Sequence, residues 1–278
     1  MKKISRRSFM AAAAVSVAAL ALTACGGSAS SAASSVASSA ASSEAVSSAA
    51  AAELTTVEAG KLTMATNATF PPYEMTTDSG EIEGIDVDTA KAIAEKLGLE
   101  LQIDDMEFDA ALLSVQQGKA DIVMAGVTVT DERKAVMDFS DSYATGIQSI
   151  IVPNDSDIAS PDDLAGKKIG TQRGTTGYIY CSDDFGDDNV VAYDDGLTAV
   201  QALNNGQVDA VVIDNAPAKE FVAANPGLVI LDTSYAEEDY AIGMAKGSSL
   251  EDAVNATLEE LKADGTLQAI VDKYITAE

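Results

Sequence analysis

An arginine stands out between residues 125 and 143, which read AGVTVTDERKAVMDFSDSY. Arg133 directly follows two carboxylates, Asp131 and Glu132, and comes shortly after an apolar run typical of a strand end. A guanidinium can meet a carboxylate with two parallel hydrogen bonds. Arg133 is therefore either half of a surface ion pair with these neighbours or a fixed cation for an anionic group from outside.

An internal repetition supplies a candidate anion. LLSVQQGKADIVMAG (112–126) and VQALNNGQVDAVVID (200–214) align without gaps, each reading as a helix, a glycine, an aspartate and a buried strand. This is either the generic α/β unit recurring or a sign of two similar lobes. Ligands of open α/β sheets bind beyond the carboxyl ends of strands, where GVTVTDER follows the first strand and Asp214 ends the second. A cleft between two lobes would set Arg133 against Asp214, a pair that suits a zwitterion.

The elements that must position these residues alternate between strand and helix patterns. Strands are predicted at 61–66, 99–104 and 121–125, and again within KKIGT, NVVAY, VDAVVI and LVILD after residue 165. A helix is predicted over 86–98, stopped by Gly98. Near the C-terminus, Ser249 is expected to cap a helix, and a second helix follows Gly265. The alternation favours a largely parallel α/β sheet.

Composition excludes several kinds of site. The 278 residues contain no histidine, so a histidine general base, a Ser-His-Asp triad and histidine metal ligands are excluded. The two cysteines, Cys25 and Cys181, form no CxxC pair, so no zinc site is expected. A net charge of −27 disfavours nucleic acid as a partner. We expect no cofactor and no metal.

The N-terminal region has the pattern of an export signal followed by a tether. Residues 1–25 combine four basic residues, a short apolar run and LTAC, which resembles a lipobox that would make Cys25 a lipidated N-terminus. SRRSFM also resembles a twin-arginine signal, which leaves the export route open. Residues 26–56 are mostly Ser and Ala and are expected to be a flexible tether. With Cys25 lipidated, Cys181 would have no disulfide partner.

From about residue 57 to the end, the chain resembles the family 3 extracellular solute-binding proteins, the amino-acid receptors of ABC importers. The resemblance rests on ATNATFPPYEM (65–75), GIDVDTAKAIAEKLG (84–98), residues 108–143, GTQRGTTG (170–177) and DYAIGMAKGS (239–248). It implies a two-lobed periplasmic-binding-protein-like fold (type II), with lobe 1 from 57–143 and 241–278 and two hinge strands plus lobe 2 within 144–240. It also implies a monomer on the outer face of the cell membrane that delivers its ligand to a permease.

The resemblance further implies the residues that contact the ligand. Arg133 would bind the α-carboxylate through its fork, helped by Thr128 and by Thr176 near a helix start. Asp214 would bind the α-ammonium, and Phe70 and Phe108 would pack against the ligand's apolar part. Backbone groups of Ala125 and Gly126 would bond the ligand. Gln172 would reach its side chain, as would Asn67, where close relatives often carry Asp.

Because neither Asn67 nor Gln172 is charged, a cationic ligand side chain would lack a counterion there, and we expect a neutral, polar amino acid. Two other functions are weighed against a receptor. An enzyme similar to the cyclohexadienyl dehydratases would need a general acid over its substrate, which the sequence does not indicate. A ligand-sensing domain would need a membrane span or signalling module, and we expect none.

Overall fold

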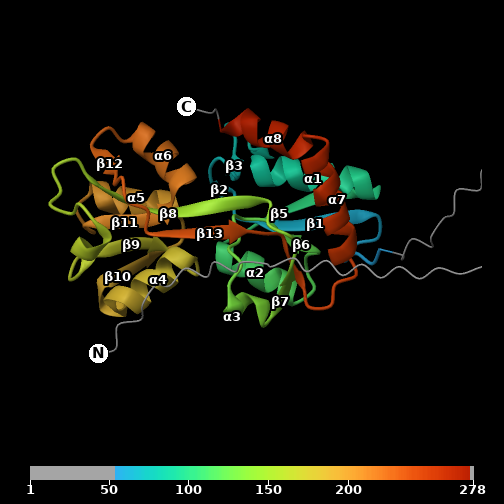
Figure 1. The fold of residues 1–278 in the computed structure, drawn as a ribbon, viewed down its shortest axis with the longest axis horizontal. Coiled ribbons are helices and arrows are strands. Elements are labelled where there is room, and N and C mark those ends of the chain that lie inside the picture. Colours follow the sequence, from blue (N-terminus) through green and yellow to red (C-terminus); the bar gives the residue numbers. More distant parts are fainter. Residues whose placement is uncertain (1–53, 276–278) are drawn as a thin grey trace, which may run out of the picture. The chain divides into compact units, whose positions relative to one another are not determined.

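The computed structural model describes residues 54–275, which form two mixed β-sheets with helices packed on them (Figure 1). The α/β class predicted from the alternating pattern is confirmed, but the expectation of a largely parallel sheet is wrong, because both sheets also contain antiparallel strand pairs. The export signal, Cys25 and residues 26–53 of the predicted tether lie outside the described residues. Across residues 54–275, no helix combines the length and the apolar character needed to cross a bilayer.

The first sheet has the strand order β5-β1-β6-β14-β7. Strand β1 pairs in parallel with β5 and β6, whereas β14 runs antiparallel to β6 and β7. A separate small antiparallel sheet, β2-β3-β4, follows β1 in the chain. The bounds are β1 (Lys61–Thr66), β5 (Glu100–Asp105), β6 (Ile122–Val123), β7 (Met137–Phe139), β14 (Gly243–Ala245), β2 (Thr69–Phe70), β3 (Glu74–Thr76) and β4 (Ile82–Glu83).

The second sheet has the order β10-β9-β11-β8-β12, with β13 also paired to β8. The strands β10, β9 and β11 are parallel, and β8 is antiparallel to β11, β12 and β13. All of these strands lie within residues 144–240, between the two parts of the chain that form the first sheet. Their bounds are β8 (Ala144–Pro153), β9 (Ile169–Gln172), β10 (Val190–Tyr193), β11 (Ala210–Asp214), β12 (Leu228–Ile230) and β13 (Ala236–Tyr240).

Each sheet has its own apolar core. Leu62 and Met64 of the first sheet are buried with Ile93 and Leu258 from the helices packed on it, and burial of such side chains contributes about 1.5–3 kcal/mol each. The second sheet buries a separate cluster that includes Ile151 and Val211. The helices are α1 (Ile85–Leu97), α2 (Phe108–Gln116), α3 (Asp131–Lys134), α4 (Thr176–Phe185), α5 (Gly196–Asn204), α6 (Asn215–Ala224), α7 (Glu251–Ala263) and α8 (Thr266–Tyr274), with 3₁₀ turns at Pro161–Leu164 and Asp187–Asn189.

Two neighbouring segments carry the chain between the sheets, at the start of β8 and after the end of β13 (Figure 1). The amide of Tyr143 donates to the carbonyl of Tyr240 at 3.0 Å, and the amide of Ser140 donates to Ile242 at 2.9 Å. The backbone of Thr128 also forms a bridge with Tyr240. The two crossings are therefore held together by main-chain hydrogen bonds.

The repetition found in the sequence is a repeated structural unit. In both copies a helix, α2 or α5, is followed by a glycine with φ 66°, Gly118 or Gly206. The aspartate after it then accepts a hydrogen bond from a backbone amide at a neighbouring strand: Asp121 from Thr63 in β1 at 2.8 Å, and Asp209 from Lys168 directly before β9 at 2.7 Å. The aspartate therefore has the same role in each copy, which goes beyond a chance recurrence of helix and strand.

Most predicted elements form within two residues of their expected bounds. β1 spans the predicted 61–66, and Gly98 caps α1 in a left-handed conformation with φ 70°. The predicted strand at 121–125 shortens to the two residues of β6. The cap expected at Ser249 is wrong, because α7 has Leu250 at its N-cap and the Ser249 hydroxyl accepts from the amide of Thr55 instead.

Candidate ligand-binding site

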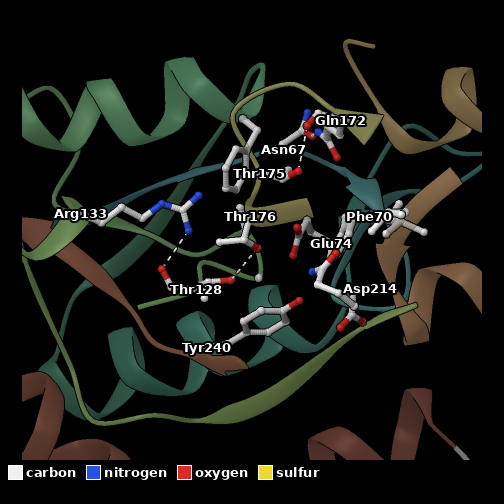
Figure 2. A pocket seen from close by; sticks show the side chains of 16 residues that line it. Asn67, Phe70, Glu74, Thr128, Arg133, Gln172, Thr175, Thr176, Asp214 and Tyr240 are labelled. Carbon is white, nitrogen blue, oxygen red and sulfur yellow. Dashed lines mark hydrogen bonds between the residues drawn. The ribbon is translucent and has the colours of Figure 1, made fainter. Parts of the chain in front are cut away.

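A pocket opens where the carboxyl ends of strands in the two sheets face each other. Asn67 follows β1, Ala125 and Gly126 follow β6, Gln172 ends β9 and Asp214 ends β11. All ten predicted site residues line this one pocket. Six lining residues were not predicted, and they are Glu74, Gln148, Thr175, Val212, Ile213 and Tyr240. Figure 2 shows Arg133 at one end, and Glu74 and Asp214 at the other.

Arg133 is buried, with only 8% of its surface exposed. Thr130 caps the N-terminus of the short helix α3, where its hydroxyl accepts a hydrogen bond from the backbone amide of Arg133 at 3.2 Å. The guanidinium donates to the carbonyls of Thr128 at 2.8 Å and Gly174 at 3.1 Å, and it lies 5.4 Å from the centre of the Phe108 ring. Burial lowers the pKa of Arg133, although it stays a cation. The surface-pair interpretation of Arg133 does not fit this position.

A buried glutamate, Glu238, lies beside the predicted hydroxyl residues. Its Oε2 accepts hydrogen bonds from Thr128 at 3.2 Å, Thr176 at 2.9 Å and Gln148 at 2.9 Å. Thr176 begins α4, as the sequence predicts, with Thr175 as its cap. Sequence analysis missed Glu238. The alternation along β13 could have found it, because Glu238 lies two residues before the buried Tyr240 and shares its face.

Asn67 and Gln172 bond to each other across the pocket. The side-chain amide of Gln172 donates to Asn67 Oδ1 at 2.8 Å, and the side-chain amide of Asn67 donates to the backbone carbonyl of Met106 at 3.0 Å. One residue follows a strand of the first sheet and the other ends a strand of the second. This contact therefore joins the two sheets directly (Figure 2).

Asp214 has a local structural role as well as a place in the pocket. As the N-cap of α6, it accepts from the amide of Ala216 at 3.0 Å, and its other oxygen accepts from the amide of Ile147 at 2.7 Å. Burial raises the pKa of its carboxyl, while these backbone donors favour the charged form. The two bonds fix the carboxylate on the pocket wall.

Glu74 is the lining residue with the largest consequence for the ligand. It is fully buried at 0% exposure on β3, and neither carboxyl oxygen makes a hydrogen bond of normal geometry with a described residue. Burial, followed by the nearby Asp86, raises the pKa of Glu74 well above its ordinary value. The sequence signal for Glu74 is FPPYEM, in which an acid follows apolar and aromatic residues.

The cavity between these side chains measures about 30 Å³. That volume holds one or two waters, so a free amino acid can enter only if the two sheets move apart. Direct contacts between them, such as Gln172 with Asn67 and Arg133 with Gly174, would then break. In residues 54–275 no cluster of three or more acidic or thiol side chains has the arrangement of a metal site.

Residues 62–277 match the family of bacterial extracellular solute-binding proteins, family 3. The chain belongs to this family. Such a protein is a receptor and not an enzyme, in agreement with the sequence prediction. Its relatives include the L-cystine-binding protein TcyJ of Escherichia coli K12, which is 33% identical over 80% of this chain and 85% of its own length.

Two further relatives of this solute-binding protein have names that specify a ligand. The arginine-binding extracellular protein ArtP of Bacillus subtilis is 34% identical, over 78% of this chain and 87% of its own. The solved structure of the arginine-, lysine-, histidine-binding protein ArtJ from Geobacillus stearothermophilus matches with a TM-score of 0.75 and 34% identity, covering 78% of this chain and 96% of ArtJ. The fold is thus that of periplasmic binding proteins, and the chain is an amino-acid-binding component of an ABC importer.

Proposed function

We propose that this solute-binding protein binds an amino acid with a cationic side chain. The charges that line the pocket carry the proposal: two acids, Glu74 and Asp214, face one cation, Arg133. The α-carboxylate and α-ammonium of a zwitterion match Arg133 and Asp214 one to one. Glu74 is then left without a partner, and a buried carboxylate needs a cation or a proton.

The backbone end of the ligand would lie between Arg133 and Asp214. Arg133 would hold the α-carboxylate with two of its N–H groups, since its bonds to Thr128 and Gly174 use only two of five donors. The amide of Thr176 at the start of α4 would add a donor. Asp214 would bind the ammonium. Phe70 and Phe108 would flank the aliphatic part, next to the backbone of Ala125 and Gly126.

The ligand's side chain would then point toward Glu74. The preference for a neutral, polar side chain assumed that no carboxylate lies at that end of the pocket, and Glu74 contradicts this assumption. The names of ArtP and ArtJ support a cationic ligand. A neutral polar amino acid remains the alternative, because Asn67 and Gln172 carry amides and a protonated Glu74 could donate a hydrogen bond. The name of TcyJ agrees with it.

Calorimetry on the purified protein at neutral pH tests the choice. We expect arginine or lysine to bind more tightly than glutamine, serine or cystine. We also expect Glu74→Gln to weaken arginine binding by at least tenfold while changing glutamine binding by less than about threefold. Glu83→Gln, on the neighbouring strand β4 and outside the pocket, is the matched control. A neutral amino acid that binds more tightly than every basic one would refute the cationic proposal.

The setting of the receptor is also part of the proposal. Cys25 would carry the lipid anchor and residues 26–56 the tether, so that lobe 1 (57–143 and 241–278) and the segment 144–240 are held near a permease on the outer face of the membrane. The resemblance of LTAC to a lipobox supports this. Cys25→Ser should release the protein from cells into the medium. A membrane-bound Cys25→Ser variant would refute the anchor.

A further inference from the structure

A second buried acid, Asp86, lies directly behind Glu74, and both are 0% exposed. The backbone brings them together: the amide of Asp86 donates to the carbonyl of Tyr73 at 2.9 Å. This approach depends on Gly84, which has φ 140°. A Cβ at that position would lie 2.1 Å from the Tyr73 carbonyl oxygen. The backbone therefore holds these two acids close together at the wall of the pocket.

Asp86 cannot turn away from Glu74 to meet other partners. Its Oδ2 already accepts from the amide of Gly126 at 3.0 Å and from the hydroxyl of Tyr143 at 2.8 Å. Its Oδ1 has no hydrogen-bond partner among the described residues, and neither has either oxygen of Glu74. Three carboxyl oxygens thus have no donor among the described residues, and a proton shared between the two carboxyl groups would supply one.

The strongest charges acting on the pair are negative. Among the described residues, the largest electrostatic effects on Glu74 come from the acids Asp86 and Asp105. Tyr73 and Tyr143 flank the pair, and burial raises the pKa of both hydroxyls, so they stay neutral.

Two more groups complete the surroundings. Tyr240 packs against Tyr73, and burial also raises its pKa. Asp214 acts on Tyr73 as a further negative charge. Arg133, the cation of the pocket, lies at the opposite end (Figure 2). Two adjacent buried carboxylates without a cation cannot both be ionised.

We propose that Asp86 is a positioning residue that shares one proton with Glu74 in the empty pocket, and that this proton is released to solvent when a cationic side chain binds. The inference rests on the proposed cationic ligand. Burial raises the pKa of Asp86 to about 6 and that of Glu74 well above its ordinary value. Asp86 accepts from Gly126 and Tyr143, which favours its charged form, whereas Glu74 has no such donor, so the shared proton resides on Glu74 and is donated toward Asp86. The arriving cation replaces it.

The proton exchange makes selectivity depend on pH. Below the pH at which Glu74 ionises, each bound cation must displace one proton, so affinity for a basic amino acid falls by up to about tenfold per pH unit as the solution becomes more acidic. A neutral amino acid displaces no proton, and its affinity stays constant over the same range. The receptor therefore discriminates between the two classes best at neutral to alkaline pH.

The test is calorimetry of arginine and glutamine in phosphate and Tris, whose ionisation heats differ widely. The dependence of the binding heat on the buffer counts the protons released. We expect about one proton per arginine at pH 7 and none per glutamine. Arginine binding without proton release would overturn the inference while leaving the cationic ligand intact. Failure of arginine to bind would overturn both.

Asp86→Asn separates positioning from mere structural support. The asparagine can still accept from Gly126 and Tyr143, and its amide can donate to Glu74, which favours the ionised carboxylate. We expect less proton release and a flatter pH profile, with arginine affinity at pH 5.5 raised relative to the wild type. A structural role alone would lower the affinity equally at every pH. Asp88→Asn, on the same helix but paired with Lys273 at the surface, should leave proton release unchanged.

Discussion

Replacing Arg133 tests the centre of the proposed site. The guanidinium is fixed by two carbonyls, Thr128 and Gly174, and by the Phe108 ring. Its remaining N–H groups are available for the two oxygens of the ligand carboxylate. Arg133→Ala would leave that carboxylate buried without a partner, at a cost of about 2–5 kcal/mol of binding free energy. This corresponds to an affinity loss of about 30-fold to several thousand-fold.

Arg133→Lys separates the charge from its geometry. The ammonium keeps the positive charge but cannot bond both carboxylate oxygens in parallel while holding the two carbonyls. We expect a smaller loss, about 1–3 kcal/mol or about 5-fold to 150-fold. Arg173→Ala is the matched control, because Arg173 is exposed and its ion pair with Asp194 is a long one, at 3.6 Å. Its removal should change affinity by less than about fivefold.

The assay is titration calorimetry with the tightest-binding amino acid and with its methyl ester. The ester lacks the carboxylate charge, so the affinity gap between wild type and Arg133→Ala should shrink for the ester if Arg133 acts through that group. Thermal unfolding checks that each variant is folded. Near-wild-type affinity of a folded Arg133→Ala for the free amino acid would refute the reasoning.

Three further predictions concern movement, pH and backbone packing. Small-angle scattering should show a smaller radius of gyration with saturating ligand than without it, because a ligand bonded to both sheets favours the closed form; an unchanged radius would count against closure. Folding raises the pKa of the Glu74 carboxyl, and such a group loses its stabilising contribution as pH increases through its folded-state pKa. The melting temperature of Glu74→Gln minus that of the wild type should therefore grow between pH 4.5 and 8. A constant difference would contradict a buried, protonated Glu74. Gly84→Ala should destabilise the fold by more than about 2 kcal/mol through its clash with Tyr73, whereas Gly227→Ala, which meets nothing within 4 Å, should melt close to the wild type.

Local patterns in the sequence predicted most of the fold. The helical spacing and terminal glycine of α1 are properties of a few consecutive residues, and they are found where expected. The error at Ser249 has a local cause too, because two adjacent serines compete and Ser248 instead accepts from the amide of Leu250 at 3.2 Å. Elements whose signals lie within one turn or one strand are therefore predictable from the sequence.

The ten site residues were predictable because their motifs are contiguous. Arg133 and Thr128 lie five residues apart, shortly after strand β6. Asp214 ends β11, the strand that matches β6 in the second copy of the repeat. Their gathering in one pocket follows from the strand ends of two sheets that face each other. Whether each one contacts the ligand stays a prediction for the experiments above.

The sequence by itself determined the α/β class, the repeated unit, the family resemblance and the ten residues that line the pocket. Only the tertiary structure decided the charge at the side-chain end. Glu74 comes from a short strand, and Asp86, the acid with the largest electrostatic effect on it, comes from helix α1. Their burial depends on packing between segments that no single motif contains. Desolvation is a property of the surroundings of a residue and not of its neighbours in the chain, so the raised pKa of Glu74 follows only from the tertiary structure.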